Sequence, residues 1–139
     1  MHTDWTLDDD DALAAIAVIK AELLKRGKPG VIAIVDNHGE TIAVLRQKGA
    51  AYSGVQIACN KAFTAVRLRR PSGELGRTVR HPEFGYDIAY FSDARYVGFG
   101  GGMPVMKDGA FVGAVGVSGL TQAEDDELAQ MGVAAILAR

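Results

Sequence analysis

The feature that most restricts the fold of this chain is a glycine-rich stretch near its C-terminal end. Seven of the 17 glycines lie between Phe99 and Gly119, at positions 100, 101, 102, 109, 113, 116 and 119. Such clusters are typical of a loop whose amides bind a phosphate, or of tight turns between closely packed strands. The first alternative would make the chain a nucleotide-binding protein.

The stretch does not fit a phosphate-binding loop. No Gly-x-x-x-x-Gly-Lys-Ser/Thr pattern occurs, and the dinucleotide fingerprint that would start at Gly98 has Met103 in place of its third glycine. The segment Gly113–Gly119 precedes a predicted helix, but residues 124–127 are all acidic and would repel a phosphate at that helix start. The glycines therefore favour strands that approach another backbone or a ligand closely, with the amides of 100–102 facing a ligand or only turning a corner.

Hydrophobic periodicity and turn residues predict an α+β fold. The order is a helix from the Thr6 cap to Gly27, strands at 31–35 and 40–46, a helix at 53–69, an aromatic loop, strands at 96–99, 103–106 and 110–117, and a helix from Thr121 to 137. Tight turns between strands predict an antiparallel sheet with helices packed against it. The length of 139 residues predicts one domain, residues 1–139.

Charge is distributed unevenly along a chain whose formal net charge is −2. From Arg46 to Arg80 there are eight basic residues and one acid, Glu74. A local basic stretch in a nearly neutral chain suits an anionic small ligand or a partner subunit better than nucleic acid. No apolar run is long enough for a membrane span, and the acidic start is unlike a signal peptide, so we expect a cytoplasmic protein without membrane association.

Several motifs together resemble the GlcG/HbpS family over nearly the whole chain. They are Val35-Asp36, Arg46 with Gly49-Ala50, Lys61-Ala-Phe-Thr-Ala65, Gly101-Gly-Met-Pro-Val105, Gly113-Ala-Val-Gly-Val-Ser-Gly119 and Asp126-Glu127. The resemblance implies a profilin-like fold of about five antiparallel strands flanked by helices, and assembly into dimers to octamers. It also implies a small-molecule ligand, since some members bind haem, whereas others accompany catabolic enzymes and act on small organic acids themselves. Lys48 stands where the family often has an acid, which makes this region more cationic.

The first functional hypothesis is a homo-oligomeric protein that binds haem or a similar planar carboxylated ligand. Cationic side chains would pair with the carboxylates, and the six aromatic residues between His81 and Phe99 would stack on the macrocycle. His81 is the preferred axial ligand, ahead of Met103 and Tyr86, although a turn residue before Pro82 is the favoured interpretation of His81 taken alone. The expected ligand-binding residues are Arg46, Lys48, Lys61, Thr64, Gly100, Gly101, Gly102 and Met103.

The second hypothesis is a cofactor-independent hydrolase or tautomerase acting on a small organic acid in a catabolic pathway. Lys61 or Arg46 would bind the substrate carboxylate, and His81, Glu83 or Asp36 would transfer protons. The amides of 100–102 would stabilise an oxyanion. We expect no metal site, because His2, His38 and His81 are scattered. A third alternative has no chemistry: the polar helix face of Asn60, Lys61, Thr64 and Arg67 would contact another subunit.

Overall fold

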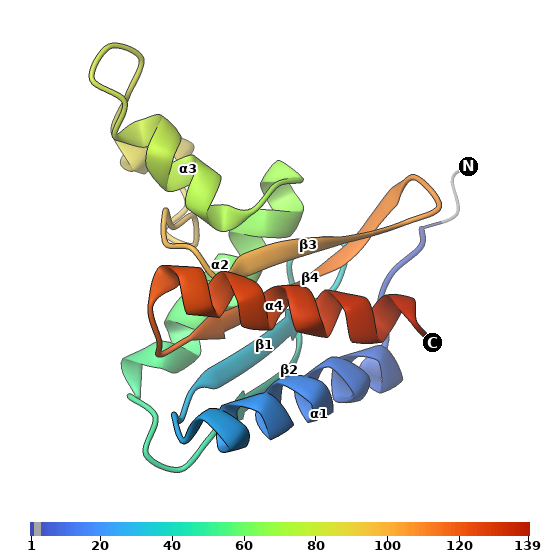
Figure 1. Ribbon diagram of the computed structural model, residues 1–139. Helices are drawn as coiled ribbons and strands as arrows, with labels where there is room; N and C mark the ends of the chain where they lie inside the picture. Colours follow the sequence, from blue (N-terminus) through green and yellow to red (C-terminus); the bar gives the residue numbers. More distant parts are fainter. Residues whose placement is uncertain (2–3) are drawn as a thin grey trace.

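The computed structural model describes residues 1 and 4–139, and His2 lies outside the described residues. Figure 1 shows the order of the elements along the chain. They are α1 (Asp9–Arg26), β1 (Val31–Val35), β2 (Thr41–Arg46), α2 (Ser53–Leu68), α3 (Ser72–Val79), the 3-10 turn η1 (Ile88–Phe91), β3 (Gly102–Lys107), β4 (Ala110–Ser118) and α4 (Gln122–Leu137). The α+β class predicted from the sequence is confirmed.

The sheet has four antiparallel strands in the order β2-β1-β4-β3. Each predicted hairpin is present, and β1 joins them by pairing with β4, from Val31 opposite Ser118 to Val35 opposite Ala114. About five strands were expected, but the structure shows no strand at residues 96–99. Here the Thr64 hydroxyl accepts a hydrogen bond from the Val97 amide at 3.0 Å and donates to the Arg95 carbonyl at 3.3 Å. The segment is therefore held by a side chain of α2 instead of a neighbouring strand.

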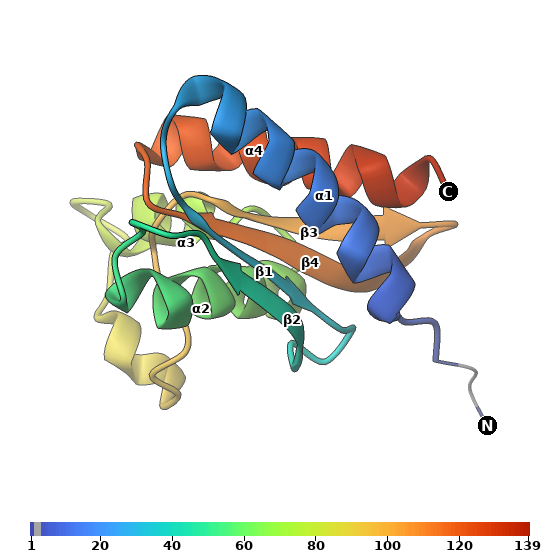
Figure 2. The ribbon, with the colours of Figure 1, turned by 90° about the horizontal axis from the view of Figure 1, so that it is seen from below.

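Helices cover both faces of the sheet, as Figure 2 shows: α1 and α4 lie on one face and α2 on the other. Side chains alternate along β1, so this strand contributes to the cores on both faces of the sheet. Ile32 and Ile34 belong to the core beneath α1 and α4, whereas Ala33 packs with Ala58 of α2. The two central strands are buried on both sides, which explains their continuous apolar sequences.

The glycines of β3 and β4 allow α2 to approach the sheet closely. Gly102 and Gly116 are register partners on adjacent strands. A Cβ on Gly116 would collide with the carbonyl oxygen of Ala58, and a Cβ on Gly102 with that of Lys61. The glycine-rich stretch is thus a pair of strands that receive a helix backbone, and this contact fixes the position of Lys61.

Two further segments differ from the sequence-based expectation or extend it. The first helix begins at Asp9 with Asp8 as its cap, because Asp8 and Asp11 form a capping box. Thr6, the predicted cap, instead accepts a hydrogen bond from the Asn37 amide at 3.1 Å. Residues 80–99 form an aromatic arm that extends from α3 and contains no buried residue (Figure 1). No helix in the described part of the chain has the length and apolar character needed to cross a membrane.

Candidate functional site

A buried ion pair connects the helices on opposite faces of the sheet. The Lys61 ammonium of α2 lies 3.0 Å from Asp125 Oδ2 of α4 and donates a second hydrogen bond to the Val117 carbonyl at 2.9 Å. Lys61 is 3 % exposed and Asp125 is 1 % exposed. Burial raises the pKa of Asp125, and the attraction of Lys61 opposes that rise only in part. A lysine has three N–H donors, so one remains for a ligand.

The pair borders a cleft of about 390 Å³, which we call the ion-pair cleft. Its lining residues come from the start of β1, from α2 and the residues before it, from the end of β4 and the start of α4, and from Phe99: Val31, Ala51, Ser53, Gly54, Ile57, Lys61, Phe99, Ser118, Gly119, Leu120, Gln122 and Asp125. A carboxyl group with a raised pKa beside a lysine is an arrangement that can bind an anion and transfer a proton. Lys61 is the residue of the predicted site that lies here.

The amides of the three consecutive glycines donate to side chains of the chain itself. The Gly100 amide donates to Gln122 Oε1 at 2.7 Å and the Gly101 amide to Asp126 Oδ1 at 2.6 Å. The Gly102 amide donates to the Ser72 hydroxyl at 2.9 Å. A ligand or an oxyanion would have to displace these acceptors, so the predicted role of the amides requires Gln122, Asp126 and Ser72 to move.

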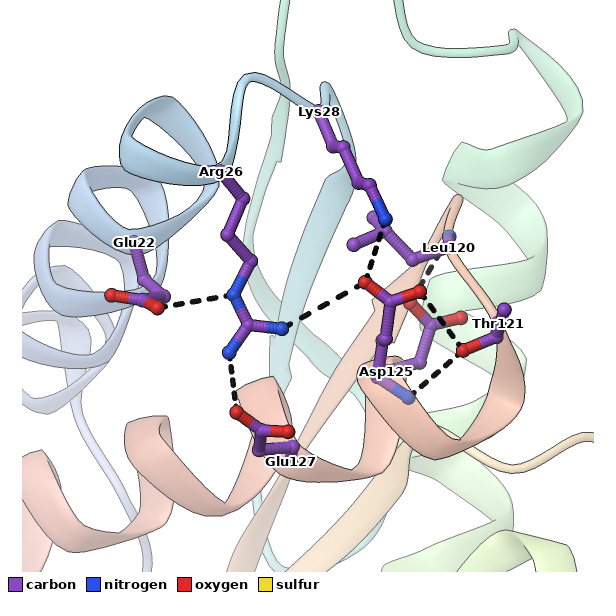
Figure 3. Close-up of polar contacts among 8 residues, drawn as sticks. Glu22, Arg26, Lys28, Leu120, Thr121, Asp125 and Glu127 are labelled. Atoms are coloured by element: carbon purple, nitrogen blue, oxygen red, sulfur yellow. Dashed lines mark hydrogen bonds and ion pairs between the residues drawn. The ribbon is translucent and has the colours of Figure 1, made fainter.

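The acidic start of α4 is neutralised by cations from the end of α1 (Figure 3). Glu124 lies 3.0 Å from the Lys28 ammonium and 3.8 Å from the Arg26 guanidinium, and Arg26 also pairs with Glu127. The hydrogen bond from Lys28 is the main reason why the pKa of Glu124 is lowered. This helix start is occupied by its own ion pairs, in agreement with the argument against a phosphate loop.

The structure separates His81 and Glu83 from Lys61. Both lie on the exposed aromatic arm, where the His81 ring stacks on Phe84 with centroids 4.9 Å apart. His81 Nδ1 accepts hydrogen bonds from the amides of Glu83 and Phe84, each at 3.1 Å. In the neutral ring the proton therefore sits on Nε2, which makes that nitrogen a donor and disfavours it as an iron ligand.

Two other predicted ligand-binding residues form hydrogen bonds with other residues of the chain. Thr64 is buried and holds residues 95–97, as described above. Met103 is 7 % exposed, and its sulfur accepts a hydrogen bond from Gln130 at 3.4 Å. Their predicted contact with a ligand stays a prediction, and it would require these interactions to break.

Arg46 and Lys48, in contrast, line a second cleft, of about 500 Å³, between the end of α1 and the end of β2. Its lining residues are Lys20, Leu23, Leu24, Gly27, Lys28, Pro29, Leu45, Arg46, Gln47 and Lys48, and we call it the basic cleft. The predicted ligand-binding set is thus divided between two places.

A third cleft, of about 480 Å³, contains residues that the sequence interpretation did not select. We call it the arginine cleft, and it is lined by Asp4, Trp5, Asn37, His38, Val66, Arg67, Arg69, Gly109, Ala110 and Phe111. The Arg67 Nε donates to the His38 carbonyl at 2.8 Å, and the Arg69 guanidinium lies over the Phe111 ring at 5.8 Å. His38 is exposed in a turn, as the sequence predicts. The turn position of His38 and the position of Arg67 on the polar face of α2 can both be predicted from the sequence. Only the fold shows that the two residues line the same cleft.

Comparisons with known proteins identify the family. Residues 7–134 match the family model described as "Haem degrading protein HbpS-like". The chain belongs to the HbpS-like family. It is 37 % identical over 112 residues to a 15.0 kDa protein of Citrobacter freundii described as uncharacterized, covering 81 % of this chain and 79 % of that protein. It is also 33 % identical over 124 residues to the corrinoid adenosyltransferase PduO of Salmonella typhimurium, covering 89 % of this chain and only 36 % of PduO.

Solved structures of family members share the fold. The Klebsiella pneumoniae protein ORFY superposes with a TM-score of 0.95 at 29 % identity, covering all of this chain and 96 % of that chain. A structure described as a PduOC:heme complex superposes with a TM-score of 0.86 at 29 % identity, covering 94 % of each chain. The resemblance drawn from the motifs is therefore confirmed.

Proposed function

We propose that this HbpS-like protein binds haem, or a similar planar carboxylated ligand, in the arginine cleft. The observation that carries the proposal is the presence in one cleft of an imidazole, two guanidiniums and two flat aromatic side chains: His38, Arg67, Arg69, Trp5 and Phe111. The haem complex of a family member supports the choice of ligand.

The chemistry of these side chains fits the parts of a haem. Guanidinium groups bind carboxylates through paired, charge-assisted hydrogen bonds, which suits Arg67 and Arg69 to the two propionates. Trp5 and Phe111 offer aromatic surface to the macrocycle. His38 would hold the haem iron in this assignment, and the bound haem would supply redox-active iron.

The surroundings of His38 also suit a ligand role better than those of His81. His38 Nε2 lies 3.8 Å from Asp4 Oδ2, and no described residue forms a hydrogen bond with its Nδ1. A carboxylate on one side of an imidazole commonly holds the proton there and leaves the other nitrogen to the metal. At His81 the equivalent nitrogen already accepts two amide hydrogen bonds.

Haemin titration, followed through the Soret band, tests both the ligand and its site. Wild-type protein is expected to give saturable binding with a shifted band. His38→Ala should lose the spectrum of an imidazole-ligated haem, and His81→Ala, the matched control, should keep it. Arg67→Gln with Arg69→Gln should weaken binding at least tenfold, since a hydrogen bond to a charged group contributes about 1.5–3 kcal/mol.

The possible results separate the function from the site. A wild-type spectrum identical to that of free haemin would refute haem binding. Loss of the imidazole signature in His81→Ala, with His38→Ala unchanged, would keep the function and refute the arginine cleft as its site.

A second candidate function, a cofactor-independent tautomerase of small organic acids, is favoured by the ion-pair cleft. The free N–H of Lys61 would bind the substrate carboxylate, and Asp125, with its raised pKa, would exchange the proton. Enolisation of phenylpyruvate, followed in the ultraviolet, is a suitable assay. Wild-type protein should accelerate it, and Lys61→Ala should not.

Because Lys61→Ala also breaks a buried ion pair, a second variant is needed for this candidate. Ile57→Trp adds bulk to the lining of the ion-pair cleft without removing either charge. It is expected to reduce turnover while thermal stability stays near that of wild type. Turnover that is unchanged in Ile57→Trp would contradict catalysis in this cleft.

We also infer that copies of the chain associate through the aromatic arm. Phe84 is 74 % exposed and Tyr90 is 78 % exposed. Large aromatic side chains that are exposed together on one part of the surface are typical of a protein–protein interface. The arm then contacts another subunit, which is the homo-oligomer expected from the sequence.

A further inference from the structure

The basic cleft lies at the opposite end of the β1–β2 hairpin from the arginine cleft. Its residues come from the end of α1, the loop that leads to β1 and the end of β2, whereas His38 stands in the turn that joins the two strands. A ligand in one cleft therefore does not contact the other. Haem binding at His38 therefore does not use the basic cleft.

The lining of the basic cleft combines cations with apolar side chains. Lys20, Lys28, Arg46 and Lys48 border it, and none of the described residues that line it is acidic. Lys28 is engaged by Glu124 at 3.0 Å. Within the part of the chain that the structure describes, Lys20, Arg46 and Lys48 form no ion pair, so their charges are available to an anion.

The position of Arg46 is already constrained. Its guanidinium lies over the Tyr52 ring, with 4.6 Å between the guanidinium carbon and the ring centroid. An arginine held on an aromatic face loses less side-chain entropy when it binds a carboxylate than a free one does. Arg46 is thus the best-prepared anion-binding group in the cleft, and Lys48 follows two residues later.

The apolar part of the lining exposes surface that an apolar ligand group would cover. Leu23 is fully buried beneath the cleft, Leu45 is half-buried, and Leu24 at the end of α1 is 67 % exposed. An apolar body of a few carbon atoms on Leu24 and Leu45 would remove this surface from water, which favours binding. A volume of about 500 Å³ is ample for such a ligand.

The geometry points to a second binding site, in which the basic cleft takes a small amphipathic carboxylate. The carboxylate binds to Arg46 and Lys48, and the aliphatic or aromatic body lies against Leu24 and Leu45. The ligand class follows from the lining: a purely hydrophilic anion would leave the leucines in water, and a neutral apolar molecule would leave the cations unpaired. This site goes beyond the proposed haem function and is independent of it.

Calorimetric titration with hexanoate tests the proposal, with acetate and hexan-1-ol as ligand controls. Hexanoate is expected to bind saturably, and acetate and hexan-1-ol at least tenfold more weakly. The double variant Arg46→Gln/Lys48→Gln should lower hexanoate affinity at least tenfold. Lys25→Gln is the matched control, because Lys25 stands in the last turn of α1 outside the lining, and it should bind as wild type does.

A third variant tests the apolar contact. Leu24→Asn removes exposed apolar surface at a position that contributes little to the core, so the fold should be preserved and hexanoate binding should weaken towards that of acetate. Equal binding of acetate and hexanoate, or unchanged affinity in Arg46→Gln/Lys48→Gln, would overturn the proposal. Haemin titration of the same double variant should match wild type, so a failure here is distinguishable from a failure of the haem proposal.

Discussion

The buried pair of Lys61 and Asp125 gives the sharpest quantitative prediction. Lys61→Met removes the cation that pairs with the Asp125 carboxylate, which is 1 % exposed. The side chain of Asp125 then keeps the hydrogen bond that it accepts from the Leu120 amide at 3.2 Å. The substitution also removes a hydrogen bond to the Val117 carbonyl. Removing one partner of a buried pair typically costs about 3–5 kcal/mol, which is a large part of a total stability of about 5–15 kcal/mol.

Replacing both partners separates the unpaired charge from the loss of packing. In Lys61→Met/Asp125→Leu no charge remains buried, and such double replacements are often neutral or even stabilising. We therefore expect the double variant to recover most of the stability that Lys61→Met loses. The measurement is urea denaturation at pH 7, followed by far-ultraviolet circular dichroism with a common m-value.

An exposed ion pair serves as the matched control. Arg95 and Glu40 lie 3.3 Å apart with side chains 40 % and 64 % exposed, so Glu40→Gln should change stability by less than about 1 kcal/mol. A loss below about 1 kcal/mol in Lys61→Met would refute the reasoning. So would a double variant as unstable as the sum of its single changes.

Three further predictions follow from contacts described above. Gly116→Ala places a Cβ against the Ala58 carbonyl and should lower the free energy of unfolding by about 1–3 kcal/mol or more, measured by the same denaturation. Gly109→Ala is the control, because a Cβ there meets open space and the variant should show only the strain of its positive φ. The pKa of Asp125 is raised above its unfolded value, so the native state binds the extra proton, and the stability contributed by this group falls as pH rises from about 4 through the raised pKa. The difference in free energy of unfolding between wild type and Asp125→Asn, measured across that pH range, should show this slope. A difference that does not change with pH would contradict the prediction. Phe84→Ala/Tyr90→Ala should shift light-scattering mass towards the monomer, with Trp5→Ala, exposed but outside the arm, as the control that keeps the wild-type mass.

Local sequence patterns predicted most of the elements, because turns and caps act over a few residues. The Asp-Gly turn at 108–109 and the Thr121 cap with Glu124 are both present. The helix start was misplaced because Asp8 and Asp11 satisfy each other across one turn, which made the earlier Thr6 unnecessary as a cap. The missing strand at 96–99 reflects a tertiary competition, in which Thr64 takes the backbone groups that a strand would have used.

The candidate sites were harder to predict, because they depend on which segments meet. Arg46 and Lys48 are near neighbours in sequence and do share a cleft. Lys61, in contrast, is fixed by Asp125, which the sequence offered only as one acid in a run of four. The arginine cleft combines the N-terminal segment, the β1–β2 turn, the end of α2 and the β3–β4 turn, and no pattern within any one of them indicates the other three.

The order β2-β1-β4-β3 has a consequence for how the chain tolerates being cut. The aromatic arm separates the first half, which contributes the β1–β2 hairpin, from the second, which contributes β3–β4, and the two halves are joined by the ladder between β1 and β4. A break in the exposed residues 81–87 would leave both hairpins and their shared ladder intact. The arm is accordingly the natural place to insert a reporter domain or to divide the chain into two fragments that reassemble.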